Sequence, residues 1–270
     1  MSNETPGWWR RTGIDLRLIL MCVLLAVMAV VFSVMSGGVF LSPENLYNVA
    51  QQTAVVGIVS TVMVLVIVAR HIDLSVGSVM GFVGVLIAYL QYTSGWSWPT
   101  ACLAGLAVAL LVSIYQGWLT AVLGVPSFVV TLGGLMSFRG AAFLVADGKT
   151  QPVNDEFFQR LGGGYDGGIG VTASWVLAGL VALVLFGRML QKRRARQRYE
   201  MPTEALWLDV LITAVPVAVV FGFAWVMNNY QISSKSEPQG IPIPVLIWAV
   251  VAIVLSFIVH RTRFGRYVFA

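Results

Sequence analysis

The chain has 270 residues, of which 58% are hydrophobic and only 11% are charged. Soluble domains carry about 25% charged residues, so this composition, with its mean hydropathy of +0.83, excludes a water-soluble globular protein. The formal net charge of +5 would suggest nucleic acid in a soluble protein, but in a membrane protein it reports orientation, and we expect no nucleic-acid partner.

Eight apolar stretches follow one another along the chain. Each approaches the roughly 20 residues that a helix needs to cross about 30 Å of hydrocarbon. They lie near residues 18–35, 49–69, 74–93, 99–119, 126–146, 172–190, 206–228 and 244–260. No stretch alternates convincingly between polar and apolar residues as a β-barrel strand would. The sequence therefore predicts an all-α polytopic membrane protein with about eight transmembrane helices, forming a single membrane domain over residues 1–270.

The basic residues predict the orientation of this domain. With the N-terminus inside, 13 of the 17 Lys and Arg residues fall on inner segments, and only three fall on outer ones. The largest inner group is a basic insertion at 188–205, and the outer three are Lys149, Arg160 and Lys235. This asymmetry follows the positive-inside rule for a cytoplasmic N-terminus and an even number of spans.

Small, hydroxylated and amide residues form one face of the second predicted span. They are Gln52, Thr53, Gly57, Ser60 and Thr61. Two interpretations stay open: helix packing, or the lining of a path for a polyhydroxylated solute. We take Gln52, Thr53 and Ser60 as candidate path residues.

The second predicted span leads into the stretch "ARHIDLSVGS" at 69–78. Arg70 ends that span on the inner side, and Asp73 and Ser75 are able to accept hydrogen bonds from the first N–H groups of the next helix, with Gly77 allowing close packing. These residues predict either a helix cap at a tight turn or a structural corner that couples to a cytoplasmic partner.

The fourth predicted span carries five small residues at i+4 spacing, and such a stripe lets helix backbones approach closely in lipid. They are Ala101, Gly105, Ala109, Ser113 and Gly117. We expect this helix to be buried among its neighbours.

The fifth predicted span contains polar residues and a glycine pair. Thr131, Ser137 and Arg139 are candidate path residues, although Arg139 near the outer third of the span also fits a snorkelling side chain. Gly133-Gly134 predicts a break in a discontinuous helix.

No catalytic or metal-binding arrangement stands out in the sequence, and we expect no cofactor. The piece "ADGKT" at 146–150 lacks the first glycine of a phosphate-binding loop, because position 143 is Phe. The twelve acidic residues lie at or outside the predicted span ends, which argues against a secondary transporter with a paired intramembrane carboxylate.

Three pieces together resemble the permease subunit of sugar ABC importers of the ribose, xylose and arabinose group. They are "IDLSVGS" at 72–78, "VPSFVVTLGGLMSFRG" at 125–140 and "TRFGR" at 262–266. With the basic segment 188–198, the span that follows it and "IPIPVLIWAVV" at 241–251, the pattern most resembles the D-xylose permeases. Two positions depart from the family pattern: His71 stands where Gly or Glu is usual, and Gln116 where Asn is common.

The resemblance implies a multi-pass permease of the inner membrane that moves a monosaccharide, D-xylose or a similar pentose. Its implied partners are a second permease copy, cytoplasmic ATP-binding subunits that hydrolyse ATP, a periplasmic sugar-binding protein and membrane lipid. Family members continue past "FGR" into a coupling loop and further helices, so we expect this sequence to be the N-terminal portion of a longer permease. A permease for ribose or galactose, a secondary transporter or another polytopic membrane protein are the alternatives.

Overall fold

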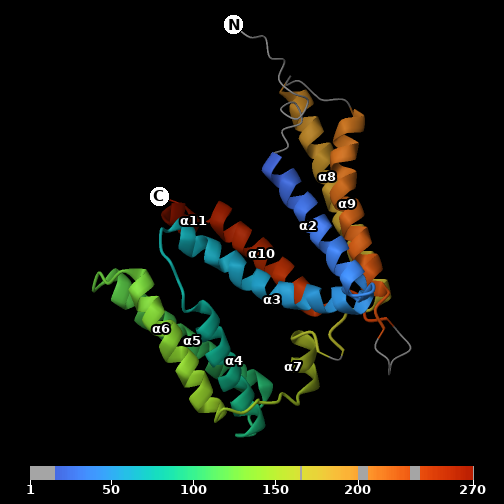
Figure 1. The fold of residues 1–270 in the computed structure, drawn as a ribbon. Coiled ribbons are helices and arrows are strands. Elements are labelled where there is room, and N and C mark those ends of the chain that lie inside the picture. Colours follow the sequence, from blue (N-terminus) through green and yellow to red (C-terminus); the bar gives the residue numbers. More distant parts are fainter. Residues whose placement is uncertain (1–15, 165, 200–205, 232–237, 270) are drawn as a thin grey trace.

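The computed structural model describes residues 16–164, 166–199, 206–231 and 238–269 (Figure 1). The described part is helical, and its only paired extended backbone is the two isolated bridges Gly168–Pro242 and Gln231–Pro238. In chain order the elements are α2 (Leu16–Met35), η1 (Val39–Leu41), α3 (Pro43–Val68), α4 (Val76–Tyr92), α5 (Trp98–Ala121), α6 (Ser127–Ala146), α7 (Glu156–Leu161), α8 (Val171–Arg198), α9 (Leu206–Asn228), α10 (Ile243–Arg261) and α11 (Arg263–Phe269).

Two helices run further than the hydrophobic pattern predicts, because polar residues support their ends. Helix α3 begins at Pro43 rather than near residue 49, and the Ser42 hydroxyl accepts the Asn45 N–H at 3.3 Å as its cap. Helix α8 continues to Arg198 rather than ending near residue 190, since cations in the last turn interact favourably with the helix dipole.

The helices pack in two groups (Figure 1). Helices α4, α5 and α6 contact one another, whereas α3 packs against α10 and α9, and α8 packs against α9. The short helix α7 contacts α10 and also meets α5, where the Trp98 ring lies 5.0 Å from the Phe157 ring.

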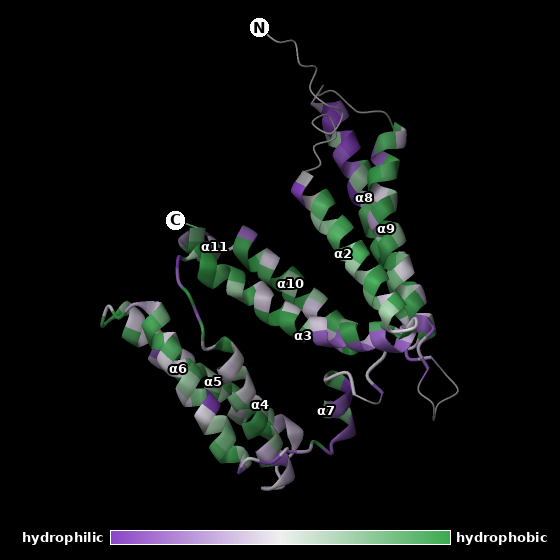
Figure 2. Cartoon of the chain, in the orientation of Figure 1, coloured by the Kyte–Doolittle hydropathy of each residue, from purple (hydrophilic) through white to green (hydrophobic). Residues whose placement is uncertain are grey.

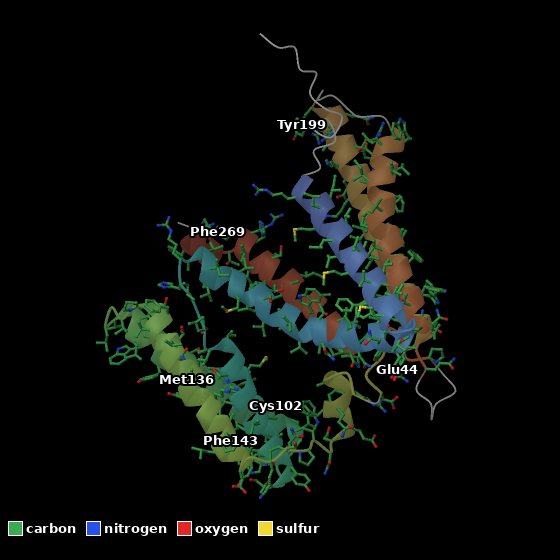
Figure 3. All side chains as sticks on the ribbon, in the orientation of Figure 1. Glu44, Cys102, Met136, Phe143, Tyr199 and Phe269 are labelled. Carbon is green, nitrogen blue, oxygen red and sulfur yellow. The ribbon has the colours of Figure 1, made fainter. Side chains whose placement is uncertain are left out.

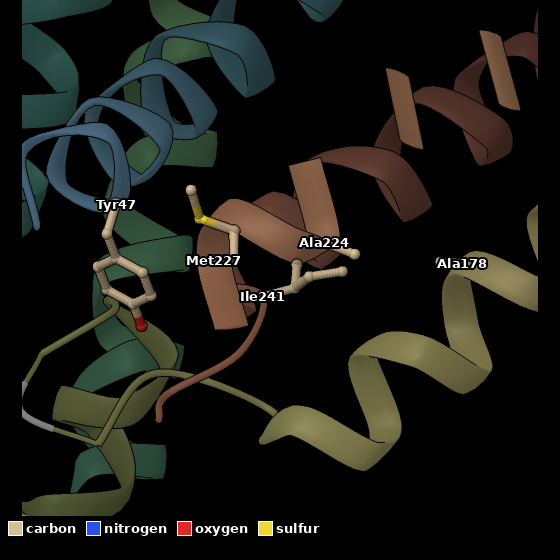
Figure 4. Packing of buried hydrophobic residues seen from close by; sticks show 5 residues of the cluster. All are labelled: Tyr47, Ala178, Ala224, Met227 and Ile241. Carbon is tan, nitrogen blue, oxygen red and sulfur yellow. The ribbon is translucent and has the colours of Figure 1, made fainter. Parts of the chain in front are cut away.

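The buried core of the second group is small (Figure 4). Tyr47, Ala178, Ala224, Met227 and Ile241 form it. The Tyr47 ring stacks on the Tyr230 ring with centroids 4.4 Å apart, and burial, assisted by the Glu44 carboxylate, raises the pKa of Tyr230.

Most large apolar side chains lie on the surface instead. Figure 2 shows hydrophobic residues along the length of the helices, and Figure 3 labels two of the exposed side chains, Met136 and Phe143. Leu144 is 80% exposed and Met35 is 77% exposed. Soluble monomers rarely expose contiguous apolar patches of this kind. The surface is therefore one that lies within a membrane, against lipid or against other helices.

In the part of the chain that the structure describes, six helices are long and apolar enough to cross a membrane: α3, α5, α6, α8, α9 and α10. Helices α2 and α4 add the shorter apolar stretches Ile19–Met35 and Val76–Tyr92. The all-α, polytopic membrane class is thereby confirmed, while the count of eight crossings and the inward N-terminus stay predictions.

One detail of the sequence prediction is wrong. Helix α6 runs without interruption through Gly133-Gly134 from Ser127 to Ala146, so the glycine pair does not break it. The small-residue stripe packs only at its start: Ala101 is buried, and a Cβ on Gly105 would lie 2.6 Å from Ile87, whereas Ala109 is half-buried and Ser113 and Gly117 are exposed. Packing of the rest of the stripe, from Ala109 to Gly117, stays a prediction.

Cysteine labelling tests the predicted orientation. In a background with Cys22→Ala and Cys102→Ala, we expect single cysteines at Lys149 and Lys235 to react with an impermeant maleimide in intact cells, and one at Arg194 to stay unlabelled. The physical reason is the excess of basic residues on the inner segments. Labelling at Arg194 but not at Lys149 would establish the opposite orientation.

Candidate functional site

The stretch 69–75 forms a corner between α3 and α4. Helix α3 ends in a Schellman turn, in which the Arg70 N–H donates to Ile67 O at 2.9 Å and the His71 N–H donates to Val66 O at 3.0 Å. This turn places Arg70 at φ +62°, the left-handed region that glycine adopts at lower energy. The exposed Arg70 therefore keeps a strained backbone that ends α3 abruptly.

Asp73 holds the start of α4 through Ser75. Its Oδ1 accepts both the Ser75 N–H and the Ser75 hydroxyl, each at 2.7 Å. The predicted cap differs in detail, because the Ser75 side chain accepts no N–H from α4 and the carboxylate binds the residue just before the helix. A carboxylate in this position is nevertheless favourable near the positive end of the helix dipole.

Ser75 also joins α4 to α5. Its side chain is buried, and its hydroxyl oxygen lies 3.1 Å from Gln116 Oε1, while Gln116 Nε2 is buried without a partner. Turning the amide by 180° exchanges these two atoms, so that Nε2 donates to Ser75 Oγ and Ser75 donates to Asp73. We assign this orientation, which satisfies the buried amide nitrogen.

A second set of hydrogen bonds ties the corner to α6. The Ile72 N–H donates to Ser127 Oγ at 3.2 Å, and the Thr131 hydroxyl lies 3.2 Å from Ile72 O. The same Thr131 hydroxyl donates to Ser127 O at 2.8 Å. The two backbone groups of Ile72, between α3 and α4, thus both lie against side chains at the start of α6.

One glycine makes this junction possible, and it is not the one that the sequence indicates. A Cβ on Gly134 would overlap the Gln116 amide and approach Ser75 Cβ to 3.1 Å, whereas a Cβ on Gly77 would meet nothing within 4 Å. Gly134 rather than Gly77 therefore makes the close approach within this chain, and close packing at Gly77 stays a prediction.

A groove of about 380 Å³ opens beside the corner. Its walls come from the α3–α4 connection and from the end of α5 with the connection to α6: Arg70, His71, Ile72, Thr120, Gly124, Val125, Pro126, Ser127 and Phe128. The site thus combines a rigid hydrogen-bonded corner with an open, partly basic surface.

The six candidate path residues do not come together in the described chain. Gln52, Thr53 and Ser60 are exposed on α3, while Ser137 and Arg139 are exposed on α6, which belongs to the other helix group (Figure 1). Thr131 is 6% exposed and belongs to the corner. A path role for the five exposed residues stays a prediction.

Two residues of the site, Ser127 and Gln116, are not among those that the sequence predicts. A signal for Gln116 was present, because an amide inside the apolar stretch Ile114–Trp118 needs a hydrogen-bonding partner in a membrane. The signal for Ser127 was weaker, because a serine next to Pro126 usually indicates only the start of a helix.

Replacing Asp73 by alanine should weaken the start of α4 by roughly 0.5–2 kcal/mol, the range for loss of a helix cap. Asp73→Asn keeps an acceptor for the Ser75 N–H and should leave stability close to that of the parent chain. Thermal unfolding of the purified variants in detergent measures the difference, and equal midpoints for the Ala and Asn variants would contradict the capping role.

The chain is similar to known proteins over a region that includes the corner and α6. Residues 45–270 match the family model described as "Branched-chain amino acid transport system / permease component". No solved structure matches the chain.

Among individual proteins, the chain is 35% identical over 260 residues to the Xylose transport system permease protein XylH of Haemophilus influenzae. It is 30% identical over 258 residues to XylH of Escherichia coli K12. These alignments cover 96% of this chain but 66% and 63% of the relatives, so the chain spans slightly less than two thirds of their length.

A shorter alignment, 32% identical over 133 residues, relates it to the Fructose import permease protein FrcC of Rhizobium meliloti, covering 49% of this chain and 37% of the relative. The family match covers the corner and all the helices that follow it, α6 included. Together with the six long apolar helices, it makes the chain a multi-pass protein of the inner membrane. The chain belongs to the family of branched-chain amino acid transport system permease components.

Proposed function

We propose that the chain forms membrane-spanning helices of the permease of an ATP-driven importer for a monosaccharide, D-xylose or a similar pentose. The observation that carries the proposal is the 35% identity to a xylose permease over 96% of the chain. The fructose permease aligns over only 49% of the chain, so a pentose is favoured over a ketohexose.

ATP hydrolysis would take place on separate, cytoplasmic subunits. The "ADGKT" piece supports this division, because it forms the end of α6 and a turn rather than a phosphate-binding loop. Asp147 is the C-cap residue of α6 and adopts φ +52°, and its carboxylate pairs with Lys149 Nζ at 2.6 Å. A phosphate-binding loop would instead direct its lysine toward the nucleotide.

The corner would couple those subunits to the helices. Asp73, Ser75 and Gln116 connect α4 with α5, and Ser127 and Thr131 connect the same segment with α6. A push on the exposed Arg70 and His71 would therefore move three helices together rather than one. A second copy of the permease and a periplasmic sugar-binding protein complete the proposed importer.

Reconstitution tests the proposal. The chain is placed in liposomes with its ATP-binding subunit, and ATP hydrolysis is measured with the sugar-binding protein and D-xylose, with D-fructose, or without sugar. We expect stimulation by D-xylose and none by D-fructose, and no hydrolysis by the chain alone. Hydrolysis by the chain alone that disappears with Lys149→Ala would refute the division of labour, and stimulation by fructose only would refute the pentose.

The same assay distinguishes two roles of Asp73. If the carboxylate only caps α4, Asp73→Asn should show normal stimulated hydrolysis. If its charge is needed for coupling, the Asn variant should bind the ATP-binding subunit normally and lose stimulation.

A further inference from the structure

The far end of α8 carries an unusual concentration of positive charge. Helix α8 has 28 residues and is therefore about 42 Å long, roughly 12 Å more than the hydrocarbon core of a bilayer. The segment Val171–Gly187 is uncharged, whereas Arg188–Arg198 contains six cations and no acid. The charged part thus begins where the helix leaves the hydrocarbon, and Figure 2 shows it as the hydrophilic end of α8.

Five of these six cations have no ion-pair partner among the described residues. The exception is Arg193, which pairs with Asp209 of α9 at 2.8 Å, both side chains being about one fifth exposed. The others form two rows at i+4 spacing along the helix surface: Arg188, Lys192 and Arg196 in one, and Arg194 and Arg198 in the other. Like charges at i+4 destabilise a helix, so an anion bound beside these rows would stabilise α8.

The Arg193–Asp209 ion pair also fixes which part of α9 lies at the same membrane depth. The first two turns of α9 present an apolar groove of about 580 Å³, lined by Leu206, Trp207, Val210, Leu211 and Ala214. Trp207 is 67% exposed, and tryptophan favours the boundary between headgroups and acyl chains. Cations and an apolar groove with an exposed indole therefore share one level of the structure.

We propose that this end of α8 and α9, which we call the basic end, binds anionic phospholipid. The phosphates would neutralise the two rows of cations on α8, and the acyl chains would cover the apolar groove on α9. A soluble acidic protein or a nucleic acid would neutralise the cations but would leave the groove and Trp207 uncovered. Lipid accounts for both halves of the surface.

The test uses the full chain purified in mild detergent, with phosphatidylglycerol and phosphatidylcholine of identical acyl chains as probes. Native mass spectrometry counts the lipids retained, and thermal unfolding gives the midpoint with each lipid. We expect preferential retention of phosphatidylglycerol and a higher midpoint with it, and a preference that falls as salt rises from about 50 mM to about 500 mM. Equal retention of both lipids by the parent chain would overturn the proposal.

A charge-removal variant and two matched controls locate the effect. Lys192→Gln, Arg194→Gln, Arg196→Gln and Arg198→Gln together should abolish the preference, with about a fivefold loss of affinity for each cation removed. The triple change Arg194→Lys, Arg196→Lys and Arg198→Lys keeps the charge and should retain the preference. Removing the cations at the end of α10 and in α11, with Arg261→Gln, Arg263→Gln and Arg266→Gln, should also retain it.

Two outcomes of the variant experiments contradict the proposal. If both glutamine sets lose the preference equally, the effect is one of total charge and the basic end is not a lipid site. If the α8 set keeps the lipid preference but no longer co-purifies with the ATP-binding subunit, the surface is a protein-docking surface instead.

Discussion

Gly57→Ala is expected to destabilise the packing of α3 against α10 by about 1–3 kcal/mol, the usual penalty for overpacking a fitted contact. A Cβ at this position would lie 2.7 Å from Cδ2 and from Cζ2 of the Trp248 indole, with a third ring atom closer still. The indole has little freedom to retreat, because its Nε1 donates to Thr61 Oγ1 at 3.0 Å and the Thr61 hydroxyl donates to Gly57 O at 2.7 Å. Thermal unfolding of the purified variant in detergent measures the loss.

Two further variants make this result specific. Gly84→Ala adds the same methyl group where nothing lies within 4 Å, and because alanine favours a helix over glycine it should be neutral or slightly stabilising. Trp248→Phe removes the part of the ring that the new methyl group meets, so the double variant Gly57→Ala with Trp248→Phe should lose less than the sum of the single changes. Additive losses would mean that Gly57 and Trp248 do not share this contact.

Gly134→Ala is the second change with a large expected effect, about 1–2 kcal/mol. The new methyl group would overlap the Gln116 amide and lie 3.1 Å from Ser75 Cβ. Gln116 can swing aside only by leaving Ser75, and a buried polar group without its partner then adds to the loss. We expect a lower unfolding midpoint and, in the reconstituted importer, weaker stimulated ATP hydrolysis.

The adjacent residue provides the control. Gly133 occupies the same helix and is exposed, and a Cβ there would meet nothing within 4 Å. Gly133→Ala should therefore leave the midpoint unchanged or raise it. If both alanine variants lose stability equally, the loss comes from the flexibility of the glycine pair rather than from the contact with Gln116, and the proposed junction is incorrect.

Much of the architecture was predictable because membrane-spanning helices satisfy their own backbone hydrogen bonds and show their length in hydropathy alone. All eight predicted spans correspond to helices, and the segment between Arg70 and Gly77 was recognisable as a corner from its cluster of charge in an apolar chain. The helix ends were less predictable, since Ser42 extends α3 through a local cap and the basic run extends α8 into water.

The sequence by itself determined the membrane class, the succession of apolar helices and the family, because each of these depends on local composition or on contiguous motifs. Only the tertiary structure decided how separate segments meet: that Gly134 rather than Gly77 makes the close approach, that Thr131 belongs to the corner, and that Gln116 binds Ser75. Hydropathy separates lipid-exposed from polar segments but carries no information about which helix faces which, since apolar faces are equally compatible with lipid and with another helix. Partners across 41 to 59 positions of sequence, such as Ser75 with Gln116 and Ile72 with Thr131, therefore emerge only when the helices are packed.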